Sequence, residues 1–103
     1  MDPAQLGLLG LGIRAGHVIV GTNGVREALQ KGELQLVVIA SDRSSRTEEK
    51  IGRLARARGV ALLEGPPADE LGRRLGRESV QAVGVRDSNL AKGIRGERAA
   101  QDH

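Results

Sequence analysis

Residues 21–42 read GTNGVREALQKGELQLVVIASD and contain three features in succession. A polar start at residues 21–24 precedes a short amphipathic helix, expected over about 23–31 and closed by Gly32. The apolar run 36–40 follows and leads into Ser41-Asp42. Because this run is apolar without interruption, it predicts a central strand that is covered on both faces.

Helical and strand patterns alternate on both sides of this stretch. Before it, Asp2-Pro3 predicts the start of a helix whose apolar side chains are well covered (Leu6, Leu8, Leu9, Leu11 and Ile13), and 18–20 predicts a strand. After it we expect a helix opened by a capping box from Ser45 to Glu48, a strand at 60–63, a short helix from Pro66-Pro67, a strand at 80–85 and a helix capped by Asp87 or Ser88. This order predicts an α/β fold, a three-layer α-β-α sandwich.

Length and composition indicate one domain over residues 1–95 and a polar tail over 96–103. Cysteine is absent, which excludes disulfides and thiol chemistry. No run approaches the roughly 20 apolar residues that span a bilayer, and no basic leader precedes the first apolar stretch. We therefore expect a cytoplasmic protein without a membrane partner.

Enzyme chemistry has few candidate residues in this chain. The only histidines are His17 and His103, and neither is arranged with a nucleophile. The glycines at 10, 12 and 16 do not have dinucleotide-loop spacing, and no strand precedes them. Acidic pairs such as Glu48-Glu49 fit the first turn of a helix. The sequence predicts no enzyme, no cofactor and no metal site.

Two interpretations fit the polar helix start. A helix N-terminus presents free N–H groups to an anion such as phosphate, and an Asn there can read a base edge. Alternatively, Thr22 or Asn23 simply caps the helix.

The net charge of +3 permits RNA binding, whereas the absence of aromatic residues excludes base-stacking platforms. Arg46, Lys50 and Arg53 recur at helical spacing and predict a cationic stripe.

Residues 6–95 resemble the kink-turn-binding ribosomal protein family (large-subunit L-seven-Ae and L-thirty-e type), especially its small bacterial members. The resemblance is carried by Leu8-Leu9-Gly10-Leu11, Arg14-Ala15-Gly16, Gly21-Thr22-Asn23, the run Val37 to Asp42, Leu71-Gly72 with Leu75-Gly76, and the segment Val83 to Lys92. It implies an α-β-α sandwich with a mixed four-stranded sheet. It also implies binding to structured RNA with sheared G·A pairs.

Two positions in the second helix depart from the family pattern, which is Gly-x-Asn-Glu-x-x-Lys. Asn23 is retained, but Gly24 stands where the family has Glu, and Glu27 stands where it has Lys. These two changes favour the alternative that the chain is a protein-interaction module which kept the fold and lost specific RNA recognition. A third alternative is an accessory domain that served an RNA-modifying enzyme.

The resemblance implies a non-catalytic RNA-binding protein of ribosomal type, whose partners are kink-turn-like RNA and the ribosome or another ribonucleoprotein. The residues expected to contact RNA are Gly21, Thr22, Asn23, Gly24, Arg26, Arg43, Ser44, Glu64, Gly65 and Pro66. In this hypothesis Asn23 reads a base edge, and the N–H groups of 22–24 and Arg43 contact phosphate.

Overall fold

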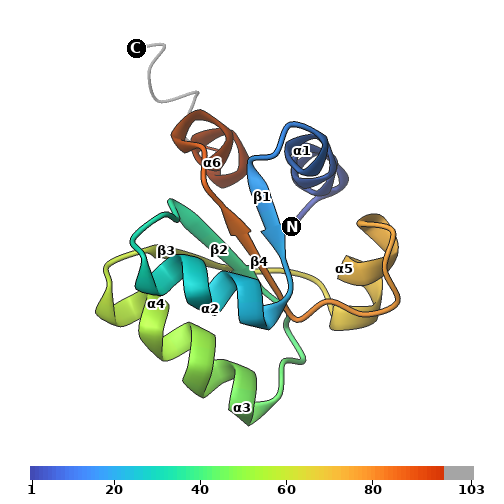
Figure 1. The fold of residues 1–103 in the computed structure, drawn as a ribbon. Helices are drawn as coiled ribbons and strands as arrows, with labels where there is room; N and C mark the ends of the chain where they lie inside the picture. Colours follow the sequence, from blue (N-terminus) through green and yellow to red (C-terminus); the bar gives the residue numbers. More distant parts are fainter. Residues whose placement is uncertain (97–103) are drawn as a thin grey trace.

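The computed structural model describes residues 1–96 of the chain (Figure 1). In chain order the elements are α1 (Pro3–Arg14), β1 (Val18–Val20), α2 (Thr22–Gln30), β2 (Leu36–Ile39), α3 (Ser45–Thr47), η1 (Glu48–Gly52), α4 (Arg53–Ala57), β3 (Ala61–Glu64), α5 (Ala68–Arg74), β4 (Ala82–Val85) and α6 (Ser88–Arg95). The consecutive segments α3, η1 and α4 form one helical stretch, which we call the third helix. The expected polar tail at 97–103 lies outside the described residues.

The strands form one mixed sheet in the order β1-β4-β2-β3. β2 pairs in parallel with β3 and antiparallel with β4, and β1 pairs antiparallel with β4. All four residues of β2 are buried. The predicted central strand and the mixed four-stranded sheet are both confirmed.

Helices cover both faces of the sheet (Figure 1). Leu36 and Val38 of β2 pack with α1, α5 and α6. Val37 and Ile39 pack with α2 and the third helix. This division follows from the alternation of side chains along a strand. The predicted three-layer sandwich is therefore confirmed, with a core of aliphatic side chains on each side of the sheet.

The first helix is less well covered than the sequence predicts. Its N-cap Asp2 forms a capping box with Gln5, as the start signal indicates. Leu6 and Leu9 are buried, but the side of the helix that carries Leu11 faces solvent, and that residue is 59% exposed. The expectation that this helix is well covered holds for Leu8, which packs half-buried against the core, and is wrong for Leu11.

The third helix differs from its prediction in two ways. It is capped by Ser44, whose side chain accepts a hydrogen bond from the Thr47 N–H, so a capping box starting at Ser45 is wrong. Its middle segment is a π turn, in which the Arg53 N–H donates to the Glu48 carbonyl. A π turn spans one residue more than an α turn, so it changes which side chains share a face. Several other element ends differ from prediction by one or two residues, as is usual for helix and strand ends.

Candidate nucleic-acid interface

Four chain segments meet at one end of the sheet, where β1, β2 and β3 end and β4 begins. We call this the loop end, and its segments are residues 21–24, 40–44, 64–67 and 81–82. Backbone bonds hold them together: the Gly21 N–H donates to the Ala82 carbonyl at 2.9 Å, and the Gly65 N–H donates to the Ile39 carbonyl at 2.8 Å. The three stretches that the sequence singled out therefore lie at the same end of the sheet, although up to 45 positions separate them in the sequence (Gly21 to Pro66) and β4 and β2 separate the two edge strands that lead into residues 21–24 and 64–67.

The start of α2 has no side-chain cap. Its N-cap is Gly21, whose φ of 107° and ψ of 151° few other residues can adopt, and no side chain bonds to the helix start. Thr22 and Asn23 are instead the first two residues of the helix. The interpretation in which either of them caps the helix is wrong, because Gly21 turns the chain into the helix one residue earlier. The first N–H groups of α2 and the exposed Asn23 side chain are consequently presented together.

Gly24 packs against β1. A Cβ at this position would lie 2.8 Å from Cγ2 of Ile19, closer than van der Waals contact allows. The glycine thus lets α2 approach β1, which gives a packing reason for its difference from the family's glutamate. Glu27 is exposed on the same flank of the helix and lines a hollow there with Glu33 and Arg86.

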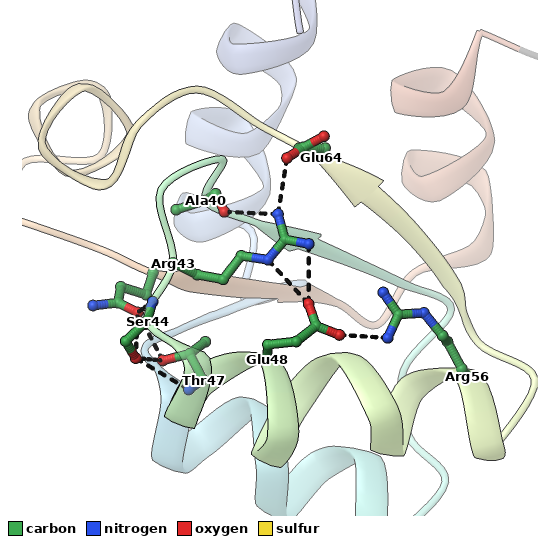
Figure 2. A network of polar contacts seen from close by, with 8 residues as sticks. Ala40, Arg43, Ser44, Thr47, Glu48, Arg56 and Glu64 are labelled. Carbon is green, nitrogen blue, oxygen red and sulfur yellow. Dashed lines mark hydrogen bonds and ion pairs between the residues drawn. The ribbon is translucent and has the colours of Figure 1, made fainter.

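Arg43 lies at the centre of an ion-pair network (Figure 2). Its Nε and Nη2 each lie 3.0 Å from Oε1 of Glu48, and its Nη1 lies 2.8 Å from Oε2 of Glu64. Nη1 also donates to the Ala40 carbonyl at 3.3 Å. The other carboxylate oxygen of Glu48 pairs with Arg56. Hydrogen bonds from Arg56 first, and from Arg43 second, lower the pKa of Glu48 below its ordinary value.

This network gives Arg43 a structural role that the sequence did not predict. Two carboxylates neutralise its charge, and one donor is occupied by the end of β2. The guanidinium ties the loop after β2 to the third helix and to the end of β3. A phosphate contact from Arg43 would have to compete with Glu48 and Glu64.

Ser44 is exposed, but its polar groups bond within the protein. Its hydroxyl caps the third helix, and its N–H donates to the Gln81 side-chain oxygen at 3.1 Å. Thr47 donates to the same oxygen from its hydroxyl at 2.7 Å. Gln81 therefore fixes the start of the third helix to the start of β4. Sequence reasoning missed Gln81, although a single polar residue inside the apolar stretch 80–85 was a usable signal.

The segment after β3 combines one exposed and one buried position. Glu64 keeps 61% of its side chain exposed. Gly65 is buried, and a Cβ there would lie 2.9 Å from Cγ1 of Val38. The Pro66 carbonyl accepts from the Ser41 N–H at 3.2 Å. Of this predicted contact segment, Glu64 presents its side chain most openly to a ligand.

Asp42 connects the loop after β2 to α5. Its Oδ1 accepts a hydrogen bond from the Ala68 N–H at 2.8 Å, which satisfies the first residue of that helix. This role of Asp42 was not predicted from the sequence. Carboxylates at helix starts are a general signal, but this one comes from 26 positions away and could not be read from local sequence.

The free N–H groups at the start of α2 and the exposed Asn23 amide give the loop end the chemistry to meet an anion and a polar edge. Within residues 1–96, no group of three or more His, Asp or Glu side chains is placed to hold a metal ion. No helix in that part of the chain combines the length and the apolar character needed to cross a membrane.

Three comparisons with known proteins place these observations in context. The model of the ribosomal protein L7Ae/L30e/S12e/Gadd45 family matches residues 6–94. The comparison with curated protein sequences finds no match.

Two solved structures share the fold. A Bacillus halodurans protein described as having unknown function is similar with a TM-score of 0.84 and 26% identity, over 92% of this chain and 96% of that one. The Giardia lamblia 15.5kD RNA binding protein is similar with a TM-score of 0.72 and 18% identity, over 97% of this chain and 92% of that one.

Proposed function

This chain belongs to the ribosomal protein L7Ae/L30e/S12e/Gadd45 family, and from that membership and the geometry of the loop end we propose that it is a non-catalytic RNA-binding protein. Its ligand is structured, kink-turn-like RNA, and it acts in the cytoplasm in association with the ribosome or another ribonucleoprotein. The Giardia lamblia protein with the same fold, which is described as RNA-binding, supports this proposal.

The observation that carries the proposal is the uncapped start of α2. The N–H groups of residues 22–24 receive no side-chain acceptor, and Asn23 is exposed beside them. Backbone N–H groups at a helix start suit a phosphate, and the Asn amide has both a donor and an acceptor for a base edge. Of the residues expected to contact RNA, Gly21, Thr22, Asn23 and Gly24 form this centre.

The remaining expected residues take supporting roles in the proposal. Arg43 and Ser44 hold the loop after β2 in place, so we assign them to positioning the RNA-binding surface. Glu64, Gly65 and Pro66 form the neighbouring wall of the loop end. Arg26, one turn into α2, is exposed and contributes positive charge beside Asn23.

The test is a comparison of RNA affinities for wild type and Asn23→Ala, measured by fluorescence anisotropy. One labelled RNA contains a kink-turn, and the other is an uninterrupted duplex of equal length. Wild type should prefer the kink-turn, and N23A should weaken its binding by about 1–3 kcal/mol because a base contact is lost.

Asn89 provides a matched control for this variant. It is also the second residue of a helix and exposed, but it lies on α6 at the opposite end of the sheet. Asn89→Ala should leave both affinities unchanged. Equal affinity of wild type for the two RNAs would overturn specific recognition, and no binding at low salt would overturn the RNA-binding function.

A second candidate function is a protein-interaction module. It is favoured by Gly24, which packs on β1, by the negative charge of Glu27, and by the neutralised charge of Arg43. Two results together would support this function in place of RNA binding. A protein partner should co-purify in fixed ratio from nuclease-treated lysate, and the chain should show no preference for kink-turn RNA.

A further inference from the structure

The two flanks of α2 differ in charge. The flank next to β1 is lined by Glu27, Lys31, Glu33 and Arg86, and the last two are 3.7 Å apart as an ion pair. The flank next to the third helix is a groove of about 480 Å³ lined by three cations and a single carboxylate. The cations are Arg26, Lys50 and Arg53, and the carboxylate is Glu49. Positive charge in excess is thus confined to one side of the helix.

The groove lies along the helix face that carries Asn23 at the start of α2. Asn23, Arg26 and Gln30 lie at i, i+3 and i+7, which places them on one face of an α-helix. Arg26 and Gln30 line the groove itself. A strand that meets Asn23 at the helix start can therefore continue along this face and into the groove.

The third helix contributes cations to the groove, and its own Glu48 does not neutralise them. Glu48 is held on another side by Arg43 and Arg56. The absence of a side chain at Gly52 leaves space for the Glu48 carboxylate, because a Cβ at Gly52 would collide with Oε2 of Glu48. Lys50 sits in the π turn and Arg53 follows it, and both line the groove. Arg46, which was expected to share their stripe, does not line it, since the π turn changes the helical register.

Like charges repel when they are gathered on a folded surface, and a carboxylate partner usually offsets that cost. Within residues 1–96, no acidic group forms an ion pair with Arg26, Lys50 or Arg53. By contrast, the nearby residues Arg43 and Arg56 both form ion pairs with Glu48. Three unpaired cations that two elements bring to one groove fit an anionic polymer with several phosphates.

We propose that the groove between α2 and the third helix binds the phosphodiester backbone of the RNA strand that continues past Asn23. This inference rests on the proposed RNA-binding function and specifies the path of the RNA. Arg26, Lys50 and Arg53 contact phosphates, and they contribute affinity without reading sequence. The flank next to β1, which carries Glu27 and Glu33, stays free of backbone.

The experiment measures the affinity for the kink-turn RNA and the uninterrupted duplex over a series of KCl concentrations. The groove variant combines R26A, K50A and R53A. Its matched control combines R73A, R74A and R77A, which removes the same number of charges from exposed arginines on and just after α5, in the opposite helical layer. Circular dichroism checks that both variants are folded.

The groove variant should bind both RNAs at least about tenfold more weakly at low salt, and its slope of log K against log salt should fall by about 2–3. Its preference for the kink-turn should persist, because the removed contacts do not read bases. The control variant should change affinity and slope much less. Glu49→Gln removes the groove carboxylate and should strengthen binding about two- to fivefold at low salt, a gain that misfolding cannot produce.

Equal losses in the groove and control variants would show that binding follows net charge, and would overturn the inference while leaving the RNA-binding function intact. Unchanged affinity in the groove variant would also overturn the inference and leave the RNA-binding function intact. Absence of RNA binding by the wild type would overturn the function and the inference together.

Discussion

At the scale of the residue, Glu48 joins parts of the chain that the sequence places apart. Its carboxylate pairs with Arg43 from the loop after β2 and with Arg56 from α4 (Figure 2). Arg43 also pairs with Glu64 at the end of β3. One carboxylate therefore fixes the loop after β2, and with it the wall of the loop end.

The stabilising effect of Glu48 should depend on pH. Its pKa is lowered in the folded protein by Arg56 and then Arg43. Its contribution is therefore present above the ordinary glutamate pKa of about 4.3 and is lost as pH falls through the lower folded-state value. Glu48→Gln should lower the thermal midpoint at neutral pH, and the difference from wild type should stay constant as pH falls from about 7 and then shrink below about pH 4.3.

Thermal unfolding followed by circular dichroism across this pH range measures the effect. Glu78→Gln serves as the control, because Glu78 is exposed and forms no ion pair within the described residues. A difference between E48Q and wild type that stays constant down to the lowest pH would contradict the account of the network.

At the scale of the element, the start of α2 depends on the conformation of Gly21. Its φ of 107° is outside the range that side chains tolerate well, and a Cβ there would meet no neighbouring atom. Gly21→Ala should therefore destabilise the protein through backbone strain alone, by more than about 1 kcal/mol in the free energy of unfolding.

Gly7 gives the opposite expectation from the same substitution. It lies within α1, and a Cβ there would also meet open space. Gly7→Ala should raise the free energy of unfolding by about 0.5–1 kcal/mol, because alanine is the better helix former. Urea denaturation compares the two variants. If G21A were as stable as wild type, the uncapped helix start would not depend on the glycine conformation.

The order of elements could be predicted from the sequence because each element carries its own periodicity and end signals. Gly32 ends the second helix as expected, with a φ of 72°. The uninterrupted run at β2 predicted its central position. These signals are local, so a single sequence contains them.

Details of the loop end could not be predicted because they depend on distant partners. Ser44 and Ser45 are equally good caps in local sequence, and Gln81, 37 positions from Ser44, selects the former. Arg43 was expected to face phosphate, but its neutralisation requires Glu64, 21 positions away. The π turn has no signature in the hydrophobic pattern, so the cationic stripe was only partly correct.

At the scale of the whole molecule, α2 and α6 begin at opposite ends of the sheet and differ in how their first turns are capped. At one end, α6 is capped by Asp87, whose side chain accepts from the Leu90 N–H at 2.8 Å. At the loop end, α2 begins at Gly21 without a side-chain cap. The molecule carries a net charge of +3, and the groove beside α2 collects unpaired cations. We expect RNA to bind at the loop end for both reasons.

The most direct test of this claim follows backbone amides by NMR while the kink-turn RNA is added to the full chain. The account predicts that the amide signals of Thr22, Asn23 and Gly24 shift most strongly, and that those of Ser88, Asn89 and Leu90 at the capped start of α6 remain in place. Strong shifts at the start of α6 with unchanged signals at residues 22–24 would contradict it.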